Sequence, residues 1–105
     1  MSVPALSAPA AEARPYDPEC TACFSVHADA DPGIMSRVLE LFAKRGLTPT
    51  SWHSRVGGVR DDELVIDIQM NGMVDREADF VAQCLRQIPA VQVVLTSRRY
   101  SAAAE

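Results

Sequence analysis

The turn Asp31-Pro32-Gly33-Ile34 has the residue types that can hold a small ionic ligand. Asp31 can accept hydrogen bonds from the free N–H groups in the first turn of a helix. Pro32 suits the first helical position, because its missing N–H is not needed there. Gly33 has no Cβ, so a ligand can come close to the backbone. A helix start of this kind suits a small carboxylate, although the same residues also describe a well-capped helix and nothing more.

Cys20 and Cys23 form a single C-x-x-C pair. Redox pairs of this form need a helix start to lower the thiol pKa, whereas these cysteines begin an expected strand. A spacing of three directs their side chains to opposite faces of that strand. His27 and His53 could meet on one sheet face if their strands are close, but a zinc site needs three or four ligands at fixed distances. We expect no metal site and no cofactor; a small metal or redox carrier using Cys20 and Cys23 is the alternative.

Side chains for catalysis do not assemble into a recognisable set. Ser36 lacks an identifiable base and orienting acid. The acidic stretch Asp61-Asp62-Glu63, with Asp67 beyond it, could do acid–base work only where burial shifts a pKa, and a solvated hairpin loop is the simpler interpretation. We therefore expect no catalytic residues and a protein that is not an enzyme.

Length and charge exclude further classes of function. A chain of 105 residues forms one domain, and its net charge of -4 argues against nucleic acid, because phosphate contacts need a basic surface. No apolar run approaches the roughly 18–20 residues of a membrane span. Three cysteines make a disulfide framework improbable, so a reducing cytoplasm is the simplest localisation.

Alternation with period two predicts strands over residues 21–28, 63–70 and 91–97, and a weaker strand over residues 47–56. Pro49 favours an edge position or a bulge near the start of that weaker strand, and residues 57–62 are interpreted as a hairpin loop. The apolar side chains expected to face inward from the strands are Ala22, Phe24, Val26, Ala28, Leu64, Ile66, Ile68, Met70, Val91, Val93 and Leu95.

Spacings of three and four predict one helix over residues 33–45 and a second from about Asp75, ended by Pro89. Glu40, Lys44 and Arg45 are expected to face water. The buried stripes of the two helices are expected to contain Ile34, Val38, Leu41 and Phe42, widened by Met35 and Leu39, and then Ala78, Val81, Leu85 and Ile88.

The order βαββαβ predicts an α+β, ferredoxin-like sandwich, with a four-stranded antiparallel sheet and two helices on one face. Cys23, Val65 and Val94 make the other face partly apolar, and such a face is often covered by a second copy. Residues 1–19 are expected to form a disordered arm rich in alanine and proline, residues 20–99 the domain, and residues 100–105 a disordered tail.

Residues 31–38, Asp-Pro-Gly-Ile-Met-Ser-Arg-Val, and 41–47, Leu-Phe-Ala-Lys-Arg-Gly-Leu, resemble an ACT domain. They look closest to the small regulatory subunit of acetolactate synthase, in its short single-ACT form. That family has Asn-x-Pro-Gly followed by two hydrophobic residues, then Arg-Val, then Leu-Phe-x-Arg-Arg-Gly and an asparagine. Asp31 directly precedes the Pro-Gly pair here, Thr48 stands at the position of the second asparagine, and the resemblance spans residues 21–98.

The resemblance implies a regulatory domain of branched-chain amino-acid biosynthesis that binds an amino acid between the protomers of a homodimer. A large catalytic subunit is a possible partner, and an orphan ACT protein that acts only as an interaction module is a second alternative. Asp31 could pair with the ammonium group of a ligand. The resemblance places Asp31, Pro32, Gly33, Ile34 and Met35 of one protomer, and Thr48 and Thr50 across the interface, in the ligand site.

Overall fold

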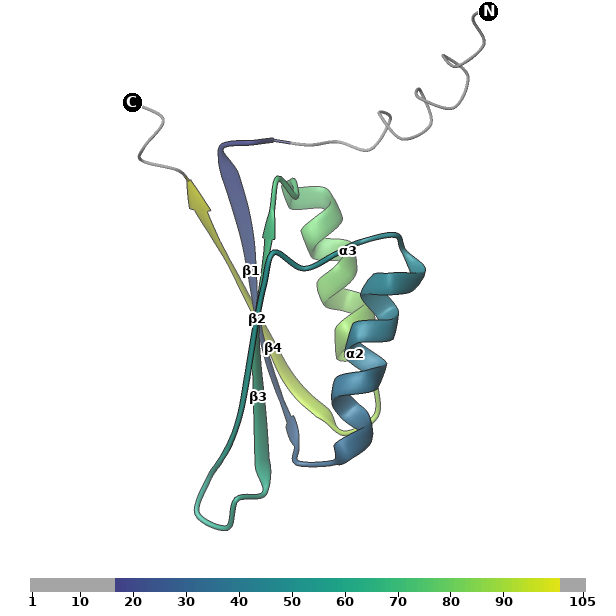
Figure 1. Ribbon diagram of the computed structural model, residues 1–105, viewed down its shortest axis with the longest axis vertical. Coiled ribbons are helices and arrows are strands. Elements are labelled where there is room, and N and C mark those ends of the chain that lie inside the picture. Colours follow the sequence, from purple (N-terminus) through teal and green to yellow (C-terminus); the bar gives the residue numbers. More distant parts are fainter. Residues whose placement is uncertain (1–16, 101–105) are drawn as a thin grey trace, which may run out of the picture.

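The computed structural model describes residues 17–100, in which four strands form one antiparallel sheet in the order β2-β3-β1-β4. Both helices cover the same face of this sheet (Figure 1). The predicted ferredoxin-like βαββαβ sandwich is confirmed. In chain order the elements are β1 (Cys20–Asp29), α2 (Pro32–Lys44), β2 (Ser51–Gly57), β3 (Glu63–Asn71), α3 (Asp75–Arg86) and β4 (Val91–Tyr100).

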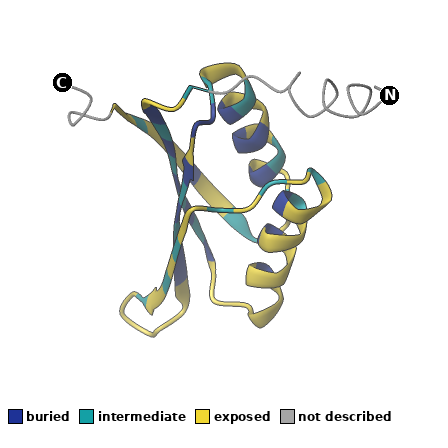
Figure 2. Ribbon diagram, turned by 45° about the horizontal axis from the view of Figure 1, so that its top comes forward, coloured by how far each residue is buried: buried dark blue, intermediate teal, exposed yellow. Residues whose placement is uncertain are grey.

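The hydrophobic core lies between the sheet and the two helices, where the buried residues face one another (Figure 2). The rings of Phe24 on β1 and Phe42 on α2 meet edge to face, with centroids 6.1 Å apart. Burying a side chain of this size stabilises the fold by about 1.5–3 kcal/mol. The alternating core residues of β1 and β3 are those that the sequence predicted: Ala22, Phe24, Val26, Ala28, Leu64, Ile66, Ile68 and Met70.

Capping residues fix both ends of α2. Asp31 caps its start and Pro32 occupies its first turn. At its end Gly46 takes a φ of +72°, a left-handed conformation that glycine adopts without steric cost. This turn lets the N–H of Leu47 donate to the carbonyl of Phe42, and the chain leaves the helix toward β2.

The buried stripe of α2 is narrower than predicted. Ile34, Val38 and Phe42 are buried, but Met35 and Leu39 are 38% and 49% exposed. In both ribbon views α2 lies on the same side of the molecule as β2, the edge strand, while α3 packs over β1 and β4 (Figures 1 and 2). We attribute the exposure of Met35 and Leu39 to this edge position, because the sheet offers α2 no further strand to cover.

The orientation of β4 differs from the prediction. Val94 faces the core opposite Val26, whereas Val93 and Leu95 lie on the open face and are 45% and 57% exposed. The cause is a bulge at which β4 advances by two residues while β1 advances by one, from His27 to Ala28. A one-residue insertion exchanges the two faces of a strand, so Val91 still packs against the core but the later residues are reversed.

The second strand is shorter than predicted, since β2 begins at Ser51 rather than at residue 47. Residues 47–50 instead link α2 to the sheet, and the N–H of Thr50 donates to the carbonyl of Gln69. Pro49 is part of this link, and it has no N–H to donate to a neighbouring strand. His27 and His53 both lie on the open face, but β3 separates their strands, so the two histidines are not neighbours.

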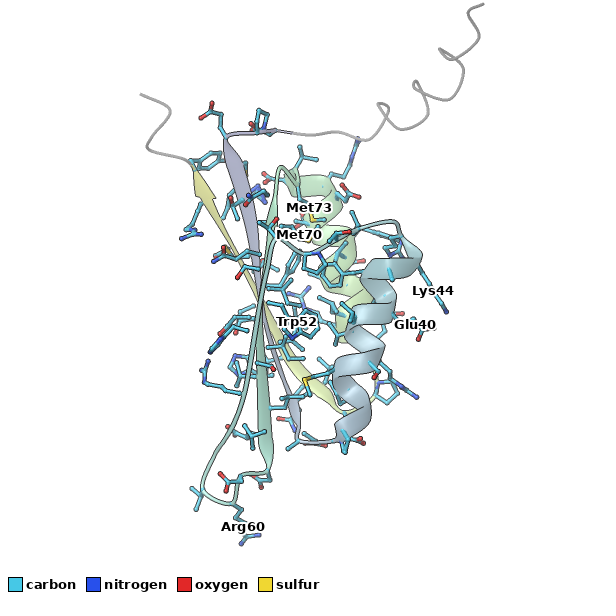
Figure 3. All side chains as sticks on the ribbon, viewed as in Figure 1. Glu40, Lys44, Trp52, Arg60, Met70 and Met73 are labelled. Atoms are coloured by element: carbon cyan, nitrogen blue, oxygen red, sulfur yellow. The ribbon has the colours of Figure 1, made fainter. Side chains whose placement is uncertain are left out.

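The hairpin between β2 and β3 extends beyond the helices, with Arg60 at its tip (Figure 3). The expected arm of residues 1–19 and tail of residues 100–105 lie largely outside the described residues. Within the described part, the N–H of Asp17 donates to the carbonyl of Gly72, and β4 includes Tyr100.

Candidate functional site

The start of α2 satisfies its own backbone donors. Asp31 has extended backbone angles, and its Oδ1 accepts the N–H of Gly33 at 2.8 Å. The carbonyl of Asp31 accepts the N–H of Ile34 at 3.0 Å. While Asp31 caps the helix, neither N–H is free for the carboxylate of a ligand. Recognition at this turn therefore depends on side chains and on space rather than on the open end of the helix.

Gly33 leaves space at this turn that the fold itself does not require. A Cβ added at Gly33 would meet Asp31 Oδ1 at 3.5 Å, which is an ordinary van der Waals contact. An alanine here would therefore fit, and alanine is the better helix former by about 1 kcal/mol. The missing side chain leaves the backbone of the first turn open to a small molecule.

A pocket of about 250 Å³ lies between the first turn of α2 and the turn that joins α3 to β4. Arg37 belongs to this pocket because helical side chains point back toward the helix start. The carbonyl of Ala90 accepts the N–H of Asp29 at 3.0 Å and holds the second turn beside the first. The residues that line the pocket are Asp31, Gly33, Ile34, Arg37, Pro89 and Ala90.

Sequence reasoning had placed Asp31, Gly33 and Ile34 in a site but missed the other half of this pocket. The four-residue spacing between Gly33 and Arg37 is a signal that could have found the arginine, since such pairs lie on one helix face. Pro89 and Ala90 carried no such signal, because only the fold brings their turn to the start of α2.

The remaining predicted ligand residues lie in different surroundings. The side chain of Ile34 is buried in the core, so only one edge of it can reach a ligand, whereas Met35 is partly exposed on the flank of α2. Thr48 is exposed in the link before β2. Thr50 is engaged within the protomer, because its Oγ1 accepts the N–H of Asn71 at 2.9 Å.

Thr48 and Thr50 lie at the opposite end of α2 from Asp31. The helix has 13 residues and is therefore about 20 Å long. Within one protomer these threonines do not join the pocket at Asp31. Only a second copy that runs antiparallel to the first could bring its Thr48 and Thr50 close to Asp31.

The cysteine pair is split between the faces of β1, as its spacing predicted. Cys20 is buried on the helix side, and Cys23 lies on the open face opposite Gln69 and Ser97. Arg98 Nη1 lies 3.7 Å from Cys20 Sγ. Among residues 17–100 no group of three or more histidine, cysteine, aspartate or glutamate side chains is arranged to hold a metal ion.

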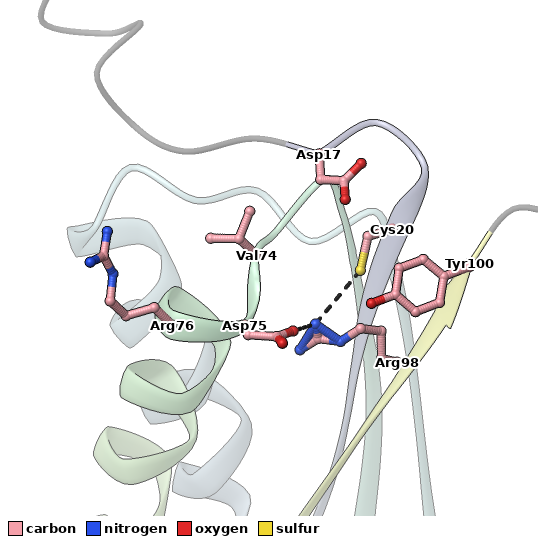
Figure 4. A pocket seen from close by; sticks show the side chains of 7 residues that line it. All are labelled: Asp17, Cys20, Val74, Asp75, Arg76, Arg98 and Tyr100. Atoms are coloured by element: carbon pink, nitrogen blue, oxygen red, sulfur yellow. Dashed lines mark hydrogen bonds and ion pairs between the residues drawn. The ribbon is translucent and has the colours of Figure 1, made fainter.

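A cavity of about 480 Å³ lies beside Cys20 (Figure 4). The strand register puts Cys20 at the end of the sheet farthest from the hairpin. Arg98 forms an ion pair with Asp75 across it. The first turn of α3 adds the acidic residues Asp75 and Glu77 near the same place. The Arg98 guanidinium therefore already has a carboxylate partner, while the charged side chains of Asp17 and Arg76 also line this cavity.

The other candidates for chemistry are surface residues. Ser36 is exposed on α2, and Asp61 and Asp62 are exposed in the hairpin. Asp67 forms an ion pair with Arg55 at 3.2 Å on the open face of the sheet.

Neither helix within residues 17–100 combines the length and the apolar character needed to cross a membrane.

The family model for an ACT-like domain matches residues 15–102, and the chain therefore belongs to the ACT-like domain family. ACT domains are typically regulatory modules without catalytic activity of their own, and many bind amino acids. The predicted ACT domain is confirmed at this level, while the closer likeness to the small subunit of acetolactate synthase stays a prediction. No curated protein matches the sequence.

Solved structures agree with this fold. The crystal structure of the ACT domain from GTP pyrophosphokinase of Chlorobium tepidum has a TM-score of 0.61 and 10% identity, over 73% of this chain and 96% of that one. The C-terminal domain of MgtC from Mycobacterium tuberculosis has a TM-score of 0.62 and 15% identity, over 85% and 97%. The regulatory subunit of aspartate kinase from Thermus flavus has a TM-score of 0.60 and 15% identity, over 81% and 54%. At these identities the likeness concerns the fold alone.

Proposed function

We propose that this chain is a regulatory domain of amino-acid metabolism that binds an amino acid and acts on a catalytic subunit, with acetolactate synthase as the enzyme. The observation that carries the proposal is the pocket at the start of α2 in an ACT-like domain. Asp31 supplies a carboxylate for a ligand ammonium, and Gly33 leaves space for the ligand. The choice of acetolactate synthase rests on the sequence pattern of residues 31–47.

The domain acts as a homodimer joined at the β2 edge in this proposal. β2 is the outer strand of the sheet, so one side of its backbone has no partner strand within the protomer. Such an edge is a ready template for a second strand. Val56 on β2 is 55% exposed, and Met35 and Leu39 are exposed on the neighbouring α2. A second copy would cover these apolar side chains.

The sequence of β2 pairs well with its own copy. If two β2 strands run antiparallel with Ser54 opposite the partner's Ser54, Trp52 lies opposite the partner's Val56 on the helix side. Aromatic and β-branched pairs across strands stabilise by about 0.2–1 kcal/mol each, and two-fold symmetry gives this pair twice. The same arrangement brings the link before the partner's β2, with Thr48 and Thr50, to the end of the domain where Asp31 lies.

Sedimentation velocity tests this dimer. We expect the wild-type chain to sediment as a dimer at micromolar concentration. Val56→Asp should give a folded monomer, because it places a charge on the apolar flank of the edge strand. Leu95→Asp is the matched control, since Leu95 is 57% exposed on β4, the strand at the opposite edge of the sheet, and it should remain dimeric. A monomeric wild type, or a Val56→Asp variant that sediments as the wild type does, would contradict the proposal.

The partner is tested by mixing the purified chain with a purified acetolactate synthase catalytic subunit. We expect the two to elute together from a gel-filtration column and the synthase activity to change when the chain is added. Elution apart, with unchanged activity, would remove this enzyme and favour an ACT protein that acts elsewhere.

A further inference from the structure

The sheet has a second open edge, formed by β4. This strand lies at the opposite end of the sheet from β2, and β1 is its one neighbouring strand within residues 17–100. From Val93 to Tyr100 it pairs with β1 without a register shift, so the edge beyond the bulge is regular. In an antiparallel pair, alternate residues direct their N–H and C=O groups away from the neighbouring strand. The outer side of β4 therefore presents a row of backbone donors and acceptors.

The composition of β4 does little to protect this edge. Natural edges are commonly blunted by charged side chains, by proline or by a short strand. β4 has ten residues, against seven in β2, and residues 91–97 contain no charge, proline or glycine. Val93 and Leu95 are exposed side by side on the open face. An extended segment is the occupant that can bond to such a row while it covers two apolar side chains spaced by two residues.

The charges at this edge are positive and have neutral partners. Arg86, in the last turn of α3, donates to the carbonyl of Val94 at 2.8 Å, and Arg99 donates to Gln69 Oε1 at 3.0 Å. Among residues 17–100 no ion pair joins either guanidinium to a carboxylate, and β4 itself has no acidic residue. Arginine pairs best with carboxylates, so an acidic strand complements this edge.

A second copy of the chain fits the edge less well. A symmetric pair of β4 strands covers Val93 with the partner copy's equivalent of Leu95 only if the two-fold axis lies near Val94. That axis brings two Arg86 side chains together, because each lies at the carbonyl of its own Val94. Like charges that face each other across strands are destabilising.

We propose that the β4 edge binds an extended, acidic segment of a partner protein as a fifth, antiparallel strand. Its carboxylates lie at Arg86 and Arg99, and its apolar side chains cover Val93 and Leu95. The inference deepens the proposed function, because it names the surface through which the domain contacts its catalytic subunit, and it rests on the part of that function that gives the domain a protein partner. The β2 edge stays available for the homodimer.

A synthetic peptide, Glu-Thr-Thr-Thr-Val-Glu-Val with both ends capped, tests the inference. Placed antiparallel with its first residue opposite Arg99, it sets its valines opposite Leu95 and Val93 and its second glutamate opposite Val94, beside Arg86. Titrated into the ¹⁵N-labelled full chain, it should shift the NMR amide signals of β4 with one common dissociation constant and leave those of β2 unchanged. The same peptide with lysine in place of both glutamates should bind about tenfold more weakly.

N-methylated peptides test the backbone pairing. One set of alternate peptide residues directs its N–H groups toward β4 and the other set directs them away. Methylation of the nitrogens in one set should therefore abolish binding, while methylation of the other set should leave the affinity nearly unchanged.

Variants of the chain connect binding to the named residues. Arg86→Glu should weaken binding of the acidic peptide about tenfold and strengthen binding of the lysine peptide. Leu95→Asp should bind neither peptide as well as the wild type binds the acidic one. Arg60→Glu, at the hairpin tip, is the matched control and should bind as the wild type does (Figure 3). If the wild-type chain elutes with the synthase catalytic subunit, Leu95→Asp should elute apart from it.

Each opposite result overturns the inference. Unchanged β4 signals with the acidic peptide at millimolar concentration, or shifts confined to β2, would reject the β4 edge as the docking site. Equal affinity of the two methylated peptides would exclude strand pairing, and wild-type affinity in Arg86→Glu would exclude the acidic partner. β4 signals that shift when the chain alone is concentrated would assign the edge to a second copy. Elution of the wild type apart from the synthase would count against the proposed function alone, because the peptide tests do not involve that enzyme.

Discussion

Asp31 has a structural role and a proposed binding role that substitutions can separate. Its carboxylate caps α2 through the N–H of Gly33. We predict that Asp31→Ala lowers the free energy of unfolding by about 1 kcal/mol, whereas Asp31→Asn changes it by only a few tenths, because asparagine caps as well as aspartate. Urea denaturation followed by circular dichroism measures both. An alanine variant as stable as the wild type would show that the cap contributes nothing.

Ala90 gives a second prediction at the residue scale. Its φ of +79° is a conformation that costs a residue with a Cβ about 1–2 kcal/mol and glycine very little. We predict that Ala90→Gly raises the free energy of unfolding by up to about 1 kcal/mol, despite the larger entropy of glycine in the unfolded chain. Ala43→Gly in α2 is the control and should lose about 1 kcal/mol. If Ala90→Gly lost as much free energy of unfolding as Ala43→Gly, the turn at Ala90 would not be strained.

Single residues were predictable where their role is local. The cap at Asp31 and the start at Pro32 follow from the order of residues, and both are present. Arg45 was expected to face water, but it lies over the ring of Phe80 at 4.4 Å and donates to Cys84 Sγ at 3.2 Å. The partners of Arg45 lie on α3, about 40 residues away, and helical periodicity carries no information on such contacts.

At the scale of the element, β4 shows what alternation leaves undetermined. Residues 91–95, Val-Gln-Val-Val-Leu, have apolar side chains on both faces of a strand, so the pattern admits either orientation. The bulge beside His27 and Ala28 decides between them and places Val94 inside. β3 had no such ambiguity, because its inward residues are apolar without a break.

This orientation gives a prediction. Val94 is 3% exposed and Leu95 is 57% exposed. We predict that Val94→Ala lowers the free energy of unfolding by about 2 kcal/mol, from lost burial and the cavity left behind. Leu95→Ala should cost less than about 0.5 kcal/mol, because it lies on the surface of the isolated protomer. Chemical denaturation at low protein concentration compares the free energies of unfolding of the two variants. A larger loss for Leu95→Ala than for Val94→Ala would mean that Leu95, not Val94, faces the core.

At the scale of the whole molecule, the fold was predictable because most elements repeat their pattern over several residues. Two helical stripes and four strands in the order βαββαβ leave few ways to bury one apolar layer. The pocket was less predictable, because it joins the start of α2 to the Pro89–Ala90 turn through tertiary structure alone. Ligand and partner depend on a few surface residues that folding does not constrain, so they need direct measurement.

The central claim is that this ACT-like domain binds an amino acid. The most direct test is a thermal-shift screen of the purified chain against the twenty amino acids. A ligand at about 100 times its dissociation constant adds about 2.7 kcal/mol, which raises the Tm of a domain this small by several degrees or more. We predict such a shift with one or a few amino acids. An unchanged Tm with all twenty at millimolar concentration would contradict the claim.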